Sequence, residues 1–259
     1  MKRRLNHRTL LEGVRYLVER DKHLAGIVST YGPPPLWERE QGFPTLIRVI
    51  LEQQVSLNSA KAAYHRLERA IDTPTPEGFA GLTDEELRRI GFSRQKTVYG
   101  RELATAILEG RLDLSRLDRL SDEDARKELI RVKGIGPWTA DIYLLMALGR
   151  PNIWPKGDLA LEVAAQRIKG WVIRPTAEEM TVMSKEWQPW RAVAARLLWH
   201  LRKKQPDMTD SAAAGAAWLI AQGRVREVRA ARIDRVKKRG HHASHYLHRF
   251  LYRIGMYCF

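Results

Sequence analysis

The sequence predicts an all-α fold, and three observations support this prediction. Apolar residues recur at helical spacing along nearly the whole chain, sequences typical of strands are scarce, and glycine and proline separate the helical stretches. With 259 residues, of which 44% are hydrophobic, the chain is long enough to bury a core of helices packed on helices.

The predicted helices can be followed in order along the chain. Residues 8–30 form one or two helices, and the prolines of the connector 30–44 cannot lie inside a helix. The long apolar stripe at 45–71 is expected to break into two helices near Ser56, and 72–82 is expected to be a loop. Capping patterns and glycine or proline signals then mark further helices at 83–90, within 91–110, at 121–132, 137–148 and 158–170, and as a pair within 176–204.

Charge divides the chain into segments. We expect N-terminal helices with a Pro-rich connector at 1–44, a core at 45–223 and a basic tail at 224–259. The chain carries a net charge of +15 with a pI near 10.2, and the tail holds ten Lys or Arg against two Asp or Glu, or +8. The remaining +7 keeps the body basic, so a polyanionic partner such as nucleic acid is favoured.

Composition excludes several classes of protein. A single cysteine, Cys258, rules out an intrachain disulfide, a cysteine zinc site and a four-cysteine iron–sulfur cluster. No run of about 18 apolar residues is present and the N-terminus lacks the pattern of a secretory signal, so no membrane partner and a cytoplasmic location are expected. The four histidines of the tail lack a neighbouring carboxylate or thiolate, and we predict no metal site there.

The stretch "LIRVKGIGPWTADIYLL" interrupts a helical pattern with two glycines, Gly134 and Gly136, and restarts it at once. Glycines let a backbone approach a phosphate closely, and Pro137 suits the first turn of the second helix. The free amides around Gly134, Ile135 and Gly136, together with Lys133, could therefore bind a DNA phosphate. The plainer alternative is an ordinary turn between two helices with a glycine cap.

Asp158 follows the loop "WPKG" and starts the next predicted helix. Capping a helix is the commonest task for an aspartate in this position. A carboxylate on the same side as the hairpin could also stabilise the positive charge that develops on a sugar when an N-glycosidic bond breaks, and could orient the attacking water.

Three stretches together resemble the helix–hairpin–helix superfamily of base-excision DNA glycosylases, most closely the 3-methyladenine DNA glycosylase II, or AlkA, type. They are "LIRVILEQQVSLNSAKA" (46–62), "LIRVKGIGPWTADIYLLMAL" (129–148) with "DLAL" (158–161), and "WQPWRAVAARLLWHL" (187–201). The resemblance implies two helical subdomains with the active-site cleft between them. The β-rich N-terminal domain of the longer family members is expected to be absent, because only about 45 residues precede the first core helix.

The resemblance also implies roles for individual residues. Asp158 matches the catalytic aspartate, and Trp199 matches an aromatic residue of the base pocket. Trp138 stands where lyase members carry a nucleophilic lysine, which implies a monofunctional enzyme that uses water. The family's second pocket aromatic falls at Ile142, so Tyr143 beside it becomes the candidate.

Further DNA contacts are expected outside the hairpin. Gln54 lies in the loop that, by resemblance, supplies the residue wedged into the gap left by the extruded base. Ser93 and Lys96, at the start of another helix, could contact phosphate, although a solvated turn is an equally good interpretation.

The predicted function is therefore hydrolysis of alkylated purines, of the 3-methyladenine and 7-methylguanine type, from damaged double-stranded DNA by base flipping, which leaves an abasic site. Tryptophan faces would attract the cationic base. A monomer without a cofactor is the simplest expectation, with a monovalent cation at the hairpin carbonyls as the one alternative. A non-catalytic DNA-binding module, a bifunctional glycosylase/lyase with Lys156 as nucleophile, and an RNA-associated protein remain open.

Overall fold

The computed structural model describes residues 4–205, within which every regular element is a helix. None of these helices is long and apolar enough to cross a membrane. The basic tail and its histidines lie outside the described residues.

The α-helices are α1 (His7–Val18), α2 (Lys22–Tyr31), α3 (Phe43–Glu52), α4 (Leu57–Ile71), α5 (Pro76–Gly81), α6 (Asp84–Ile90), α7 (Arg94–Leu108), α8 (Asp122–Ile130), α9 (Pro137–Met146), α10 (Leu159–Ile168), α11 (Ala177–Met183) and α12 (Arg191–Lys204), with short 3-10 helices at Leu114–Arg116 and Ser184–Trp187.

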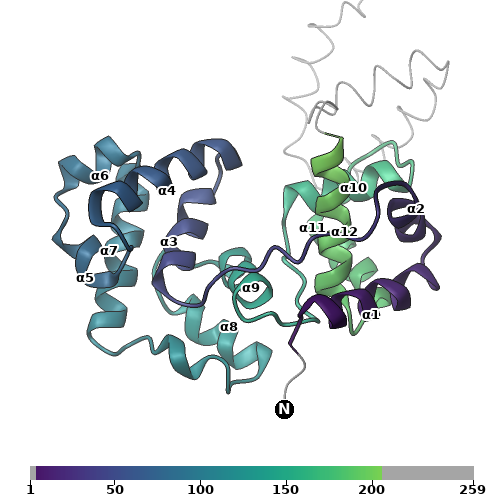
Figure 1. Cartoon of the computed structure of the whole chain (residues 1–259), viewed down its shortest axis with the longest axis horizontal. Coiled ribbons are helices and arrows are strands. Elements are labelled where there is room, and N and C mark those ends of the chain that lie inside the picture. Colours follow the sequence, from purple (N-terminus) through teal and green to yellow (C-terminus); the bar gives the residue numbers. More distant parts are fainter. Residues whose placement is uncertain (1–3, 206–259) are drawn as a thin grey trace, which may run out of the picture.

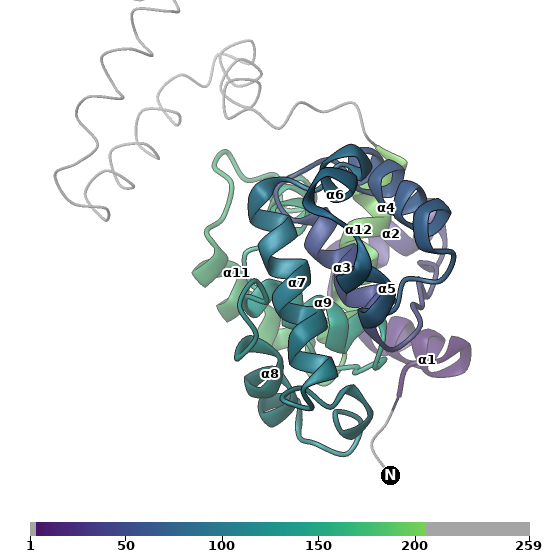
Figure 2. The ribbon, with the colours of Figure 1, turned by 90° about the vertical axis from the view of Figure 1, so that its left-hand side faces the viewer.

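The helices form two lobes (Figure 1). The first lobe holds α3 to α7, and Figure 2 shows it facing the viewer with α4 to α7 gathered around α3. The second lobe holds α1, α2 and α10 to α12, while α8 and α9 lie between the lobes. Because α1 and α2 pack against α12, the N-terminal helices share a lobe with the C-terminal end of the described chain.

Local capping signals set most helix boundaries. The stripe at 45–71 divides as expected, because α3 ends at Glu52 and the Ser56 side chain caps α4 by accepting a hydrogen bond from the amide of Ser59. Thr83 and Glu86 form the predicted capping box of α6. The expectation of a loop at 72–82 is wrong, since Thr75 caps the short helix α5 and Pro76 occupies its first turn.

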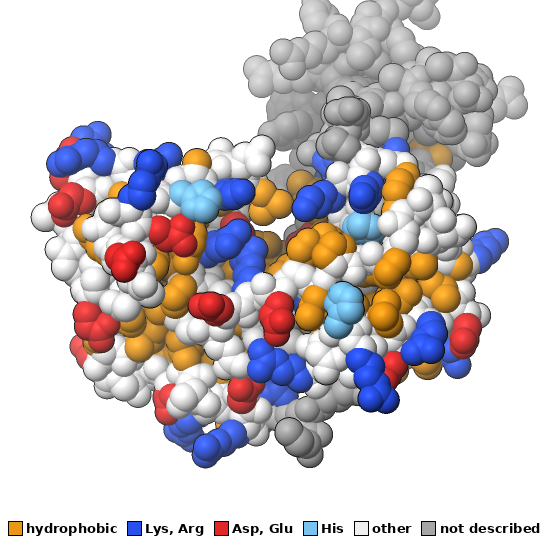
Figure 3. Space-filling model, in the orientation of Figure 1, with side chains coloured by type: hydrophobic (Ala, Val, Ile, Leu, Met, Phe, Trp, Pro, Cys, Tyr) orange, Lys and Arg blue, Asp and Glu red, His pale blue; other side chains and the backbone are white. Residues whose placement is uncertain are grey.

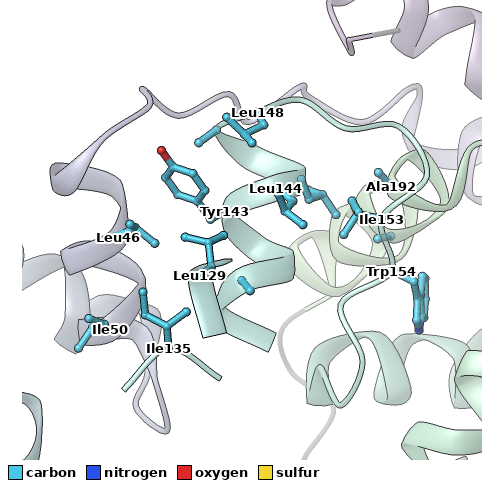
Figure 4. Packing of buried hydrophobic residues seen from close by; sticks show 14 of the residues in the cluster. Leu46, Ile50, Leu129, Ile135, Tyr143, Leu144, Leu148, Ile153, Trp154 and Ala192 are labelled. Atoms are coloured by element: carbon cyan, nitrogen blue, oxygen red, sulfur yellow. The ribbon is translucent and has the colours of Figure 1, made fainter. Parts of the chain in front are cut away.

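The hydrophobic core continues from one lobe to the other through α9 (Figure 4). Every residue of α9 from Thr139 to Leu145 is buried, so this helix has no solvent face over two turns. Burying its large aliphatic side chains, Ile142, Leu144 and Leu145, stabilises the fold by about 1.5–3 kcal/mol each. The elements on either side of α9 are thereby held at fixed positions relative to it.

Candidate active site

The predicted hairpin joins α8 to α9 through a tight turn, in which the Ile135 amide donates to the Val132 carbonyl over 3.0 Å. Gly134 has a φ of +96°, and a Cβ there would lie 2.3 Å from Cγ of Tyr99. Nothing lies within 4 Å of a Cβ placed on Gly136, and no side chain caps the start of α9. The start of α9 is therefore not capped by a side chain, and the space beside Gly136 is open, as an anion site at a helix start requires.

Lys133 precedes this turn with an exposed side chain that has no hydrogen-bond or ion-pair partner within residues 4–205. Because no acidic side chain within residues 4–205 neutralises it, the Lys133 ammonium is available to bind a phosphate next to the hairpin amides. The structure thus brings the predicted backbone and side-chain donors of the hairpin to one surface.

Gln53 connects the hairpin to the loop after α3, a link that the sequence analysis missed. Its side-chain amide donates to the Gly134 carbonyl over 2.9 Å and to the Thr139 hydroxyl over 3.0 Å. The next residue, Gln54, is exposed and has a φ of +56°, a strained conformation for a non-glycine residue. Gln53 therefore ties the loop that carries Gln54, here called the wedge loop after its expected role, to the hairpin.

Ser93 and Lys96 hold helices together at the start of α7. The Ser93 hydroxyl caps α7 by accepting a hydrogen bond from the Lys96 amide over 3.3 Å. The ammonium of Lys96 donates to the Leu51 carbonyl at the end of α3 over 2.6 Å, and burial lowers the pKa of Lys96. Their contact with phosphate stays a prediction, beside these structural tasks.

Asp158 lies at the N-cap of α10, with both carboxylate oxygens engaged. Oδ1 accepts hydrogen bonds from the Leu161 amide over 3.0 Å and from the indole Nε1 of Trp199 over 3.2 Å. Oδ2 accepts from the indole Nε1 of Trp138 over 3.0 Å. The structure thus places three of the residues chosen from the sequence within one hydrogen-bonded group built on α9, α10 and α12.

The carboxylate of Asp158 has no protein counter-charge nearby. Within residues 4–205, no Lys, Arg or His nitrogen lies within 4.0 Å of its oxygens. Asp21 offers a comparison, because it also caps a helix and accepts an indole hydrogen bond, from Trp187 over 3.0 Å, yet Lys169 lies 3.7 Å away. The negative charge of Asp158, which is partly exposed, is left for a cation from outside the protein.

The loop that carries Asp158 is held at several points along its length. The Gly149 carbonyl accepts from the Leu5 amide over 2.7 Å, and the Pro151 carbonyl accepts from the Ala192 amide over 2.9 Å. The guanidinium of Arg191 donates to both oxygens of Asn152 at 3.0 Å. Anchors on the N-terminus and on α12 therefore limit the movement of the loop before it reaches Asp158.

Asp141 holds the end of this loop. Its buried carboxylate pairs with Arg126 of α8, with an Nη2–Oδ1 distance of 2.6 Å, and accepts a hydrogen bond from the backbone amide of Lys156. The side chain of Lys156 pairs instead with Glu178 over 3.2 Å. The sequence marked neither Asp141 nor Arg126, because a buried ion pair between two helices leaves no local signal.

The structure does not bring Tyr143 into the base site, which corrects the choice made from the sequence. Tyr143 is 0% exposed, its ring packs in the hydrophobic core, and its hydroxyl accepts a hydrogen bond from the Gly42 amide over 2.9 Å (Figure 4). A ring enclosed in this way cannot stack on an extruded base.

The site residues converge between the two lobes. The wedge loop comes from the first lobe, Asp158 and Trp199 come from the second, and Trp138 lies on α9 between them. The space-filling view shows the surface hollowed between the lobes (Figure 3). Residues 4–205 contain no cluster of three or more His, Cys, Asp or Glu side chains that could hold a metal ion.

This arrangement defines a helix–hairpin–helix protein with a carboxylate held by two indoles at the start of α10. Residues 47–191 match the model of the HhH-GPD superfamily base excision DNA repair proteins, and the chain belongs to this superfamily. The match confirms the predicted all-α fold.

Individual relatives agree with the family assignment. The chain is 34% identical over 184 residues to a putative DNA-3-methyladenine glycosylase of Bacillus subtilis, covering 68% of this chain and 64% of that relative. It is 29% identical to DNA-3-methyladenine glycosylase 1 of Schizosaccharomyces pombe, covering 72% and 84% of the two chains. A solved structure of a Schizosaccharomyces pombe 3-methyladenine DNA glycosylase with abasic DNA superposes with a TM-score of 0.68 at 28% identity, covering 77% of this chain and 98% of that one.

The two hairpin glycines should respond differently to alanine. We expect Gly134→Ala to lower the free energy of unfolding by about 1–3 kcal/mol, because its Cβ would overlap Tyr99 and its φ is positive. We expect Gly136→Ala to keep the wild-type melting temperature and to weaken DNA binding, since its Cβ would occupy the space open to a phosphate. Thermal denaturation and binding to a fluorescent duplex measure both effects.

Gly26→Ala is the matched control. Gly26 on α2 also has nothing within 4 Å of the position that a Cβ would take, but it lies in the second lobe away from the hairpin. If Gly136→Ala bound DNA as tightly as Gly26→Ala does, the hairpin would not be a close backbone contact.

Asp141 should make stability depend on pH in an unusual direction. Burial raises the pKa of Asp141 to about 6 from 3.8, against the opposing effect of Arg126. The contribution of Asp141 to the free energy of unfolding is therefore fully present below pH 3.8, and it is lost as the pH rises through about 6. Relative to Asp141→Asn, the wild-type protein should gain about 1–3 kcal/mol of unfolding free energy as pH falls through this range.

Urea unfolding at several pH values between 4 and 7 measures this difference. Glu77→Gln, which removes an exposed carboxylate without an ion pair in the described part of the chain, controls for general charge effects. A difference between wild type and Asp141→Asn that stayed constant with pH would contradict the buried, proton-binding state of Asp141.

Proposed function

We propose that this protein hydrolyses the N-glycosidic bond of alkylated purines in double-stranded DNA and leaves an abasic site. One observation carries the proposal: the Asp158 carboxylate is held by Trp138 and Trp199 without a protein counter-charge within 4.0 Å among the described residues. The family membership and the named relatives support the same activity.

DNA binding begins at the hairpin. The open amides of α9 and the ammonium of Lys133 bind a phosphodiester next to the damaged nucleotide, a contact that carries no sequence information. A base inside a duplex is out of reach, so the damaged nucleotide rotates out of the stack, and Gln54 fills the gap that it leaves. Because Gln53 ties the wedge loop to the hairpin, both contacts form on one rigid surface.

The chemical step uses the charge that alkylation puts on the base. The C1′–N bond breaks, its electron pair moves to the cationic purine, and the base leaves as a neutral molecule. Positive charge then develops on the sugar, where the Asp158 carboxylate stabilises it. Water attacks C1′ and loses a proton to the same carboxylate, which gives the abasic site.

Water, and no lysine, is the nucleophile in this proposal. The indole of Trp138 occupies the position where a lyase member would carry its lysine, and it binds Asp158 directly. Lys156 lies two residues before Asp158, but its ammonium pairs with Glu178. Borohydride reduction with abasic DNA should leave no trapped covalent adduct, and a trapped adduct would favour the bifunctional alternative.

The proposed active unit is a monomer that acts on the DNA of the cytoplasm. All the residues of the site come from one chain, so no second copy is needed to complete it. No cofactor has a part in the steps above. At the hairpin, the Val132 and Gly134 carbonyls already accept hydrogen bonds from Ile135 and Gln53, and other carbonyls there stay candidates for a monovalent cation.

Asp158→Asn tests the catalytic role directly. Asparagine keeps the N-cap through its Oδ1 and the shape of the side chain, so DNA affinity should stay near the wild-type value. Its Nδ2 cannot accept the hydrogen bond from Trp138, so the melting temperature should fall by a few degrees. Release of 3-methyladenine and 7-methylguanine from methylated duplex should fall by roughly 10²- to 10³-fold, because the charge at C1′ is lost. Single-turnover assays of free base and binding to abasic DNA measure the two properties.

Asp21→Asn is the matched control, since Asp21 has the same N-cap position and an indole partner but lies on α2. It should release base at the wild-type rate. If the wild-type protein binds DNA and releases no base from methylated duplex, the proposal fails and the non-catalytic DNA-binding module remains.

A further inference from the structure

Trp37 lies on the connector between α2 and α3, which crosses from the second lobe to the first (Figure 1). Its φ is +48°, one of three positive values at non-glycine residues within residues 4–205. An L-residue with a bulky side chain rarely adopts this conformation, and holding it costs about 1–3 kcal/mol.

The surrounding structure holds this strained backbone from both sides. The buried guanidinium of Arg196 donates to the Leu36 carbonyl over 2.7 Å. The Arg39 amide donates to the Met146 carbonyl over 3.1 Å, and the Arg39 side chain forms two hydrogen bonds with Glu52 over 3.0 and 2.9 Å. The chain on each side of Trp37 is therefore anchored to α12, α9 and α3, and the indole is held in place.

The indole of Trp37 lies against α12, the helix that also carries Trp199 of the Asp158 group. Its ring centroid is 6.2 Å from that of His200, and the Lys203 ammonium lies 5.8 Å from it. Trp199 immediately precedes His200 and is one turn before Lys203, and residues four apart are neighbours on a helix surface. Trp37 therefore lies against the part of α12 that carries Trp199.

The indole of Trp37 is partly exposed and its Nε1 has no hydrogen-bond partner among residues 4–205. This distinguishes it from Trp138, Trp199 and Trp187, whose Nε1 atoms each bind a carboxylate. A rigid, partly exposed aromatic face with an unused donor is suited to stacking on a flat ligand.

We propose that Trp37 is a base-binding residue, whose indole stacks on the extruded purine beside Trp199. It supplies the second aromatic surface of the site, a role that the buried Tyr143 cannot take and that Ile142 does not offer. This inference rests on the proposed glycosylase function and assigns a recognition residue from outside the family motifs.

Trp37→Gly is the variant that separates stacking from structure. Glycine tolerates the positive φ, so the substitution removes the ring and relieves the backbone strain together. Trp37→Phe keeps a smaller aromatic face. Trp171→Ala is the control, because Trp171 is 41% exposed after the end of α10 and takes no part in the group around Asp158.

Two substrates distinguish a stacking residue from a scaffold residue. A duplex with 7-methylguanine offers a base to stack on, whereas a duplex with a tetrahydrofuran abasic analogue offers none. Trp37→Gly should release 7-methylguanine roughly 3- to 30-fold more slowly in single-turnover assays. Its affinity for the abasic duplex and its melting temperature should match those of the Trp171→Ala control, and Trp37→Phe should fall between Trp37→Gly and wild type.

If Trp37→Gly releases base at the wild-type rate, the inference is overturned. If Trp37→Gly loses base release and affinity for the abasic duplex together, Trp37 has a scaffold role and the inference is also overturned. If Trp37→Gly does not fold, Trp37→Phe decides: a folded protein with slowed release and normal abasic affinity supports stacking, and any other result contradicts it. An inactive wild-type protein in the same assay contradicts the proposed function itself, whereas an active wild type with an equally active Trp37→Gly contradicts the role of Trp37 alone.

Discussion

The hydrogen bonds from two indoles to the Asp158 carboxylate are the constraint on which the rest of the site depends. An indole N–H is a neutral donor, so it can fix both oxygens of a carboxylate without cancelling the negative charge, as a lysine or arginine would. These bonds form only when α9, α10 and α12 meet at one point. The continuous burial of α9 and the anchored loop before Asp158 satisfy that requirement.

Asp21 shows that this local pattern alone does not make a catalytic site. Both aspartates cap a helix and accept an indole hydrogen bond, and Asp21 also accepts two backbone amides. Burial acts to raise the pKa of Asp21, but the hydrogen bonds from Trp187 and the amides, with Lys169, leave that pKa lowered overall. Lys169 balances the charge of Asp21, whereas no cation lies within 4.0 Å of Asp158 among the described residues. In the proposed function, this difference is what leaves Asp158 available to a ligand.

The sequence could predict those features that depend on neighbouring residues. The hairpin glycines, the N-cap position of Asp158 and the break before α4 follow from local signals, and resemblance added Trp138 and Trp199. The sequence could not predict that Gln53 binds the carbonyl of Gly134, 81 positions away. Nor could it decide whether Ile142 or Tyr143 faces the base site. Successive residues on a helix point about 100° apart. Because every residue from Thr139 to Leu145 is buried, periodicity does not reveal which of them faces the core and which the cleft.

The same helix joins DNA binding to chemistry. The uncapped start of α9 is at Gly136; Pro137 has no N–H to donate, and Trp138 comes one residue later, within the first turn. A helix rises about 1.5 Å per residue, so the phosphate-binding end and the indole that holds Asp158 are a few ångströms apart along one rigid axis. In the proposed function, a phosphodiester bound at the hairpin would thereby fix the sugar of the adjacent nucleotide relative to the carboxylate. Gln53 adds the wedge loop to this unit through Gly134 and Thr139, so a displacement of the duplex that weakens the phosphate contact also moves the extruded sugar away from Asp158.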